Sequence, residues 1–160
     1  MSNEEDIQQR LVQKFPATEG KFRIQRARRI WVEVPADMLL QFIQYAKDEL
    51  KFIEFCIITG LDEGESLGVV YHVAQSYTGI MLGVKISVPK TNPIVPTITH
   101  LFPAADLPER EIEDLFGAKV VGLAPGRRYP LPDNWPKDEH PLLKDWKPKA
   151  TAASTEAQNG

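Results

Sequence analysis

The chain has 160 residues, of which 42% are hydrophobic and 26% charged, with a formal net charge of −3. This balance is typical of one globular domain, and it disfavours a nucleic-acid partner, whose phosphates need clustered Lys and Arg. An apolar run long enough to span a membrane, a signal-peptide pattern and a second cysteine are all missing, so we expect a cytoplasmic protein without an internal disulfide or a cysteine-bound iron–sulfur cluster.

The first part of the chain predicts a helix, a strand and a second helix. Residues 3–14 have apolar positions at helical spacing and end before Pro16. Residues 22–34 alternate as one long strand, and Arg26 and Arg28 interrupt its apolar side, so only its second half is expected to be well buried. A helix is predicted from residues 35–37 to about Leu50. Its apolar face consists of Leu39, Phe42, Ile43, Ala46 and Leu50.

Three further strands are expected before residue 89, joined by short turns. Residues 52–59 are rich in β-branched and aromatic residues and are expected to form a buried strand, with Cys56 as a buried, inert thiol. Strands over 67–74 and 77–88 follow, and the second of these alternates most cleanly. Short connections favour antiparallel hairpins. The predicted fold class is therefore α+β, a mainly antiparallel sheet with packed helices.

A short segment, Glu109–Gly117, carries the highest density of charge in the chain. Asp106 at the N-cap position and Glu109 three residues later predict a capping box, and Gly117 predicts the end of the helix. Ile112, Leu115 and Phe116 fall on one apolar face. These local rules predict a well-capped surface helix over 106–117.

The charges of this helix are crowded. Glu109 and Glu113 lie four residues apart and repel each other by roughly 0.2–0.5 kcal/mol. Arg110 faces Asp114 in the less favourable orientation for a helix. The arrangement is better explained if cationic groups elsewhere complete it, either from within the chain, at Arg127 and Arg128, or from a partner.

The segment after this helix predicts an extended arm. Six of the thirteen prolines lie between residues 122 and 148, which excludes a long helix or a central strand. The aromatic residues Tyr129, Trp135 and Trp146 are unusual for a disordered linker. The two tryptophans would either anchor a protein interface or cover the sheet of their own domain. We therefore expect three parts: an α+β domain over 1–121, the arm over 122–148 and a disordered tail over 149–160.

The sequence gives little support for other kinds of functional site. The three histidines lie far apart in the sequence and at none of the spacings of metal ligands. The glycines do not form a phosphate-binding loop. A hydrolase that used the acidic cluster would need a shielded pocket and a tuned partner for one carboxylate, and the sequence indicates neither.

The charged segment has the form Glu-Arg-Glu-x-x-Asp-(Leu/Met)-Phe-Gly. In this it resembles the C-type (30 kDa) subunits of respiratory complex I and of membrane-bound, energy-converting NiFe hydrogenases. Two further blocks, 126–136 and 141–145, resemble later blocks of the same family and occur in the same order. The resemblance covers roughly residues 103–146.

The sequence departs from the pattern of that family at several positions, and two of its segments favour the hydrogenase branch. Leu107-Pro108 stands where the NADH-linked members usually have a Trp, Gly122-Leu-Ala-Pro-Gly lacks their histidine, and Leu143 replaces an Arg. Residues 125–133 and 29–34 look more like the hydrogenase branch. We therefore expect a subunit of a hydrogenase or formate-hydrogenlyase type of complex, with the equivalent subunit of an NADH–quinone oxidoreductase as the alternative.

The resemblance implies a subunit with no catalytic residue, metal or cofactor of its own. Its partners would be the large catalytic subunit, which holds the NiFe site (or the quinone site in complex I), and a small subunit with iron–sulfur clusters. It would lie on the inner face of the cytoplasmic membrane and contact the membrane only through these partners. The residues implied in docking are Glu109, Arg110, Glu111, Asp114, Phe116, Gly117, Arg127, Arg128, Tyr129, Pro130 and Trp135. Two other classes remain open: a stand-alone enzyme that uses the acidic cluster, and a free binding module.

Overall fold

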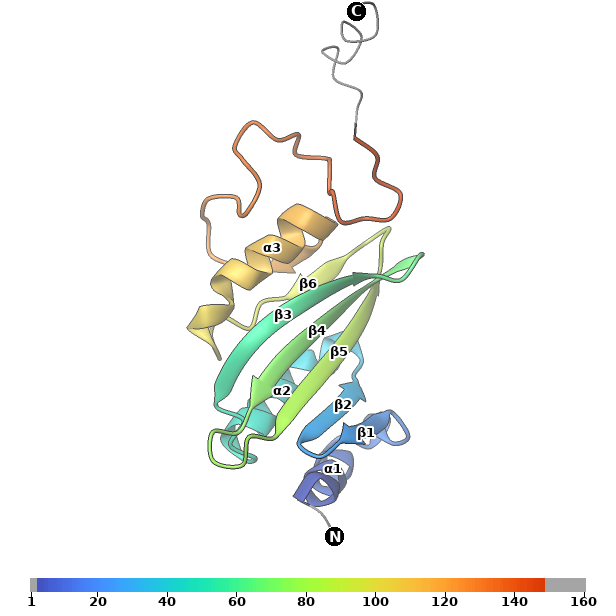
Figure 1. The fold of residues 1–160 in the computed structure, drawn as a ribbon, viewed down its shortest axis with the longest axis vertical. Helices are drawn as coiled ribbons and strands as arrows, with labels where there is room; N and C mark the ends of the chain where they lie inside the picture. Colours follow the sequence, from blue (N-terminus) through green and yellow to red (C-terminus); the bar gives the residue numbers. More distant parts are fainter. Residues whose placement is uncertain (1–2, 149–160) are drawn as a thin grey trace, which may run out of the picture.

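The computed structural model of the protein describes residues 3–148, and these form a two-layer α+β fold (Figure 1). The predicted fold class is thereby confirmed, whereas the tail expected over 149–160 lies outside the described residues. The helices are α1 (Asn3–Lys14), α2 (Leu39–Asp48) and α3 (Asp106–Phe116), with short 3-10 turns at Pro16–Thr18, Ala36–Met38 and Pro103–Ala105. The strands are β1 (Phe22–Arg26), β2 (Arg29–Glu33), β3 (Glu54–Asp62), β4 (Ser66–Ala74), β5 (Met81–Pro89), β6 (Ile94–Pro96) and β7 (Lys119–Val121).

The main sheet has five strands in the order β1-β2-β5-β4-β3. The β3–β4 and β4–β5 pairs are antiparallel, as the short turns predicted. The β2–β5 pair is parallel, with Ile30 opposite Leu82 and Val32 opposite Val84. A parallel neighbour needs a long connection, and α2, β3 and β4 together provide it.

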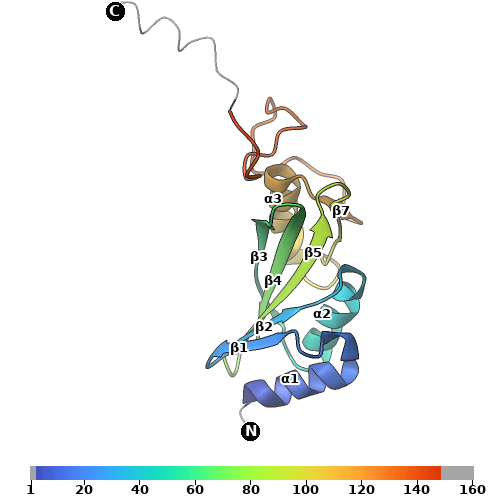
Figure 2. The ribbon, with the colours of Figure 1, turned by 90° about the vertical axis from the view of Figure 1, so that its right-hand side faces the viewer.

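The core lies between the sheet and the helices α1 and α2, which cover the same face (Figure 2). The whole predicted apolar face of the second helix, including Leu50, is buried, and so is the alternating row of residues 80–88. Leu39, Phe42 and Leu82 are among the side chains without measurable exposure. Helical and strand periodicity therefore identified the two surfaces that meet.

The single strand expected over 22–34 is wrong, because this segment is the β1–β2 hairpin. Phe22 pairs with Val32, and the chain reverses at Ala27-Arg28, where Arg28 has a φ of 61°. The positions that interrupt the apolar pattern therefore lie at the turn. The expected difference in burial is confirmed, since Ile30, Val32 and Val34 are buried and Ile24 is 37% exposed.

The buried strand expected over 52–59 is also wrong. Here β3 runs to Asp62 at the edge of the sheet, and Ile58 is its one buried residue. Ile57 is 45% exposed and Cys56 is exposed as well, which contradicts the expectation of a buried thiol. A β-branched sequence favours the pleated conformation, but it does not distinguish a central strand from an edge strand.

Candidate docking site

The helix α3 packs beside the edge strand β3, on the same face of the sheet as the buried Ile58. Its Phe116 ring lies against Gly60, where a Cβ would come within 2.5 Å of Phe116 Cε2. Ile112 is buried, whereas Leu115 and Phe116 are partly exposed. The helix ends at Gly117, which has a φ of 74° as the predicted C-terminal glycine.

The predicted capping box is wrong. The N-cap residue is Ala105, without a side-chain hydrogen bond, because the 3-10 turn before it runs directly into α3. Asp106 is already inside the helix. Glu109 does not reach back to the N-terminus and points into the protein instead, where its exposure is 0%.

Glu109 attaches the helix to the segment after β6. Its carboxylate accepts a hydrogen bond of 2.5 Å from Thr97 Oγ1 and one of 2.6 Å from the backbone N–H of Ile98. Burial raises the pKa of Glu109, and these two hydrogen bonds oppose that effect. A buried carboxylate with its oxygens engaged has a structural role.

Glu113 attaches the same helix to β7. The backbone N–H of Val120 donates to Glu113 Oε1 at 3.0 Å. The parallel β6–β7 pair that results, with Val95 opposite Val120, was not predicted. Strands of three residues are too short to show an alternating pattern.

Arg110 is engaged within the chain. Its guanidinium donates to both carboxylate oxygens of Asp106 at 3.0 Å and to the carbonyl of Ala124 at 2.9 Å. It also covers Gly126, where a Cβ would lie 2.6 Å from Nη2. The expectation that Arg110 faces Asp114 is wrong. Arg110 pairs with Asp106, four residues earlier, and an acid that precedes its base is the favourable orientation in a helix. The hydrogen bond from Arg110 lowers the pKa of Asp106.

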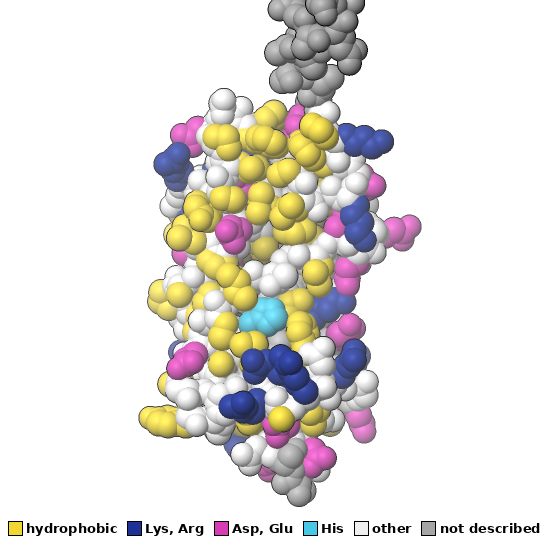
Figure 3. Space-filling model, in the orientation of Figure 1, with side chains coloured by type: hydrophobic (Ala, Val, Ile, Leu, Met, Phe, Trp, Pro, Cys, Tyr) yellow, Lys and Arg dark blue, Asp and Glu magenta, His cyan; other side chains and the backbone are white. Residues whose placement is uncertain are grey.

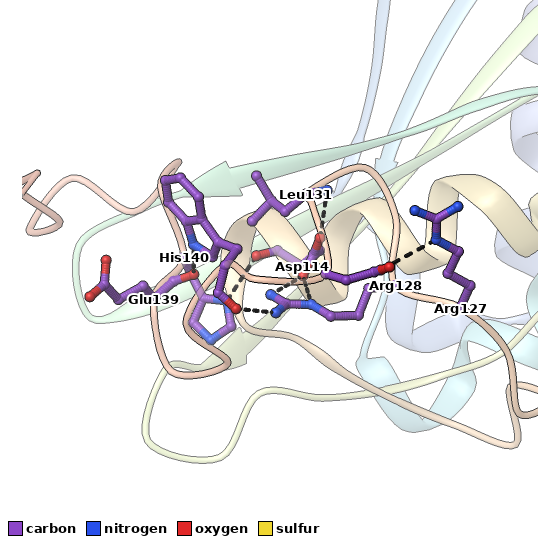
Figure 4. Close-up of polar contacts among 8 residues, drawn as sticks. Asp114, Arg127, Arg128, Leu131, Glu139 and His140 are labelled. Carbon is purple, nitrogen blue, oxygen red and sulfur yellow. Dashed lines mark hydrogen bonds and ion pairs between the residues drawn. The ribbon is translucent and has the colours of Figure 1, made fainter.

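Asp114 is the point at which the arm joins the helix (Figure 4). It is 5% exposed, accepts from Arg128 Nε at 2.7 Å, and accepts from the backbone N–H of Leu131 at 2.8 Å. Arg128 also donates to the carbonyl of Trp135 at 2.7 Å. The arm thus folds back over α3, and the cation that completes the acidic cluster comes from within the chain.

Arg127, which was expected to share that role, does not contact the cluster. It pairs with Asp133 at 3.3 Å, and the two side chains are 78% and 74% exposed. An ion pair this exposed contributes little to stability, about 0–1 kcal/mol. Arg127 and Arg128 are therefore neighbours in sequence with different environments.

The tryptophans of the arm pack against each other. The ring centroids of Trp135 and Trp146 are 5.9 Å apart. Trp135 Nε1 donates to the carbonyl of Glu139 at 2.9 Å, and Trp146 Nε1 lies 3.3 Å from a carboxylate oxygen of the same residue. These contacts close a loop within the arm.

Two further contacts hold the arm in place, and no local pattern in the sequence indicates either of them. His140 Nδ1 lies 2.9 Å from the carbonyl oxygen of Asp114, and its ring fills the space beside Gly117. Farther along, the backbone N–H of Lys144 donates to Asp62 Oδ2 at 2.8 Å, and Lys90 Nζ pairs with Asp62 at 2.6 Å. Asp62 is the last residue of β3, so the arm is attached to the helix and to the end of the β3–β4 hairpin.

The remaining predicted docking residues form an outer surface over α3 and the arm. Tyr129 is 41% exposed, Pro130 is exposed, and Glu111 has no hydrogen bond or ion pair within residues 3–148. Leu107 and Leu142, which the sequence pattern did not indicate, are 52% and 51% exposed. Between helix and arm runs a groove of about 290 Å³ lined by Arg110, Glu113, Asp114, Arg127, Arg128 and His140.

Neither a metal site nor a membrane-spanning helix is found in the described part of the chain. Residues 3–148 contain no group of three or more His, Cys, Asp or Glu arranged to hold a metal ion. None of the helices over the same range is long and apolar enough to cross a membrane.

Comparison with known proteins places this arrangement in a family. The sequence profile of the family described as "Respiratory-chain NADH dehydrogenase, 30 Kd subunit" matches residues 32–152. The chain belongs to this 30 kDa subunit family. It is 35% identical, over 116 residues, to an NADH-quinone oxidoreductase subunit of Moorella thermoacetica, and the match covers 71% of this chain and 77% of that one.

Some relatives outside NADH dehydrogenases match over more of the chain. The membrane-bound hydrogenase subunit beta of Pyrococcus furiosus is 26% identical over 152 residues, which cover 92% of this chain and 88% of that one. A chain in the structure of the membrane-bound sulfane sulfur reductase, an archaeal respiratory membrane complex, superposes with a TM-score of 0.77 at 25% identity, over 91% of this chain and 86% of that chain. The 30 kDa family thus contains subunits of several kinds of respiratory complex.

Proposed function

We propose that this member of the 30 kDa family is a non-catalytic, cofactor-free subunit of a membrane-bound, energy-converting NiFe hydrogenase complex. It docks on the large catalytic subunit, which holds the NiFe site, beside a small subunit with iron–sulfur clusters. It lies at the inner face of the cytoplasmic membrane and reaches the membrane only through these partners. The equivalent position in an NADH–quinone oxidoreductase is the second candidate.

The observation that carries this proposal is the difference between engaged and free carboxylates along α3. Of the five carboxylates between residues 106 and 114, four accept hydrogen bonds from groups of this chain. The fifth, Glu111, has no such contact within residues 3–148. The internal bonds therefore fix a rigid surface, and Glu111, Arg127, Tyr129 and Pro130 remain on it for a partner.

The same observation weakens the interpretation as a stand-alone hydrolase. A glycoside hydrolase needs two carboxylates that can reach one substrate bond. Here Glu109 is fully buried against Thr97 and Ile98, and Asp114 is engaged by Arg128 and Leu131. The acidic cluster is better suited to holding helix and arm together.

The hydrogenase branch is favoured by sequence features of this chain. The block of residues 125–133 and the strand residues 29–34 are similar to that branch, and the hydrogenase relative aligns over nearly the whole chain. The higher identity to an NADH-quinone oxidoreductase subunit keeps the other branch open as the alternative.

The proposal is tested in the native complex with the charge reversal Glu111→Arg. The matched control is Glu19→Arg, an exposed acid far from α3. With a tag on this chain, we expect Glu111→Arg to reduce recovery of the large subunit and Glu19→Arg to leave it unchanged. Normal recovery and normal activity of the Glu111→Arg complex would contradict the docking role.

The branch is decided by the protein that co-purifies. A large subunit with four cysteines for a NiFe site, together with hydrogen-dependent dye reduction, supports the hydrogenase proposal. A large subunit without those cysteines, in a complex that reduces quinone with NADH, supports the alternative.

A further inference from the structure

The face of the main sheet opposite the helices is open. Helices α1 and α2 lie on one face, and no helix of residues 3–148 covers the other (Figure 2). We call this second face, from the β1–β2 hairpin to β3, the open sheet face. It is separate from the surface formed by α3 and the arm.

One end of the open sheet face carries arginines in an unfavourable arrangement. The β1–β2 hairpin holds Arg23, Arg26, Arg28 and Arg29 within seven residues. Arg26 and Arg29 are directly opposite each other in the register, and like charges in this position destabilise a strand pair. Figure 3 shows basic side chains gathered below a histidine on this face.

None of these four arginines forms an ion pair with a carboxylate within the described part of the chain. Arg29 donates to the carbonyl of Arg28. By contrast, Lys85, on the same face, pairs with both Glu33 and Glu63. The protein thus neutralises the cation in the middle of this face and leaves those of the hairpin unneutralised.

The hairpin that presents the arginines is fixed in place. The backbone N–H of Arg28 donates to Glu4 Oε1 of α1 at 2.6 Å, and its carbonyl accepts from the N–H of Met81 at 3.0 Å. Both bonds hold a turn whose central residue has a positive φ, a conformation that costs roughly 1–2 kcal/mol outside glycine. Cationic groups on a rigid support lose less entropy on binding.

The arginines continue into an aromatic and apolar strip. Trp31 lies flat over Gly83, where a Cβ would be 3.0 Å from Trp31 Cε3, and its ring meets His72 edge-on at 5.4 Å. In the register, the strip passes from Trp31 through Gly83 and His72 to Ile57, which is 45% exposed on the edge strand. Tryptophan, arginine and exposed apolar side chains in one patch are typical of a protein interface.

We propose that the open sheet face is a second docking surface, occupied by a segment of a neighbouring subunit that carries carboxylates beside apolar side chains. The inference rests on the proposed function only in requiring that the chain works in a multisubunit complex. Charge complementarity identifies the acidic part of the partner, and the strip from Trp31 to Ile57 identifies the apolar part. A purely ionic ligand would leave that strip exposed to water.

The test compares single charge changes in the native complex. We expect Arg26→Glu and Ile57→Glu each to reduce recovery of neighbouring subunits by about fivefold or more, which is about 1 kcal/mol. The control Arg10→Glu changes an exposed arginine of α1 without a described contact and should leave recovery unchanged. Normal recovery with both Arg26→Glu and Ile57→Glu overturns the inference.

Folding of the full chain separates this effect from simple damage. Arg26→Glu places an opposite charge across from Arg29, so the Tm of the purified chain should stay constant or rise by about 1–2 °C. Loss of assembly without loss of Tm therefore supports a docking role. A fall in Tm that matches the loss of assembly overturns it.

Three further outcomes are informative. If Glu111→Arg disrupts the complex while Arg26→Glu and Ile57→Glu do not, this inference fails and the proposed function stands. If only Arg26→Glu and Ile57→Glu disrupt the complex, the docking role of α3 and the arm fails instead. Binding of the chain to phosphatidylglycerol vesicles, lost in Arg26→Glu while assembly is normal, would show that a membrane is the occupant and would overturn the proposal of a protein partner.

Discussion

Arg128 donates from Nε to Asp114 Oδ1 at 2.7 Å, and this ion pair fixes the Pro-rich arm to α3. The adjacent Arg127 forms an ion pair that is almost entirely in water. Two arginines in consecutive positions therefore offer a direct comparison between an internal and an external cation.

We predict that Arg128→Ala lowers the free energy of unfolding by about 1.5–3 kcal/mol, because it leaves a nearly buried carboxylate with fewer donors. Arg127→Ala should change it by less than about 0.5 kcal/mol. Urea denaturation of the two variants measures the difference. Equal effects of the two substitutions would show that the arm is not held through Asp114.

The buried carboxylate of Glu109 gives a prediction on pH. Burial raises its pKa above the ordinary value of 4.5, so the folded chain holds more protons than the unfolded chain between 4.5 and the raised pKa. Stability must then fall as the pH rises through this window. Glu109→Gln removes the titration, so its free energy of unfolding relative to the wild type should increase across the same window. A constant offset between the two proteins from pH 4 to 7 would contradict the raised pKa.

Gly117 and Gly20 make a matched pair, since both have a φ of 74°. A Cβ at Gly20 meets nothing within 4 Å, whereas one at Gly117 would lie 2.7 Å from Cδ2 of His140. Gly20→Ala should therefore cost only the backbone strain, about 1–2 kcal/mol, and Gly117→Ala should cost a further 1–3 kcal/mol or so from overpacking.

Thermal unfolding of the two glycine variants gives these values. The double variant Gly117→Ala/His140→Ala should recover part of the additional loss, because the clash is removed. If Gly117→Ala is no worse than Gly20→Ala, the arm does not lie on the end of α3.

Cys56 provides a chemical test of the edge strand. The side chain of Cys56 reaches the surface. Its pKa is raised, mainly because neighbouring atoms remove part of its hydration and then because of the negative charge of Glu54; the positive charge of Arg29 opposes this shift. We expect Cys56 to be modified completely by iodoacetamide, but more slowly at pH 8 than a free thiol of ordinary pKa. Glu54→Gln should accelerate the reaction. Failure of the thiol to react in the folded chain would indicate that β3 is covered.

Much of the fold was predictable because its periodic elements are long. The apolar face of α2 and the row of β5 both recur over several turns or pleats, and both are buried as predicted. The β1–β2 hairpin was missed because its turn contains no glycine, asparagine or proline, only Ala27 and Arg28. The parallel β2–β5 pair depends on segments far apart in the sequence, about which local patterns carry no information.

The candidate site was predictable as a segment but not in its internal contacts. A glutamate at position 109 fits a capping box as well as it fits a buried carboxylate, so the sequence alone could not distinguish these two roles. The partner of Asp114 was one of two adjacent arginines, and only the path of the arm distinguishes Arg128 from Arg127. The contact of Asp62 with Lys144 joins residues 82 positions apart, and neither residue type indicates it.

That last contact has a consequence for the folding kinetics. The β3–β4–β5 strands form from neighbouring segments, whereas the arm can only attach once α3 and the end of β3 are in place. We expect contacts at such a large separation to form after the transition state, because closing so long a loop costs conformational entropy. Substitutions at Asp62 or Arg128 should therefore accelerate unfolding and leave the refolding rate nearly unchanged, so the arm governs the lifetime of the native state more than the speed of reaching it.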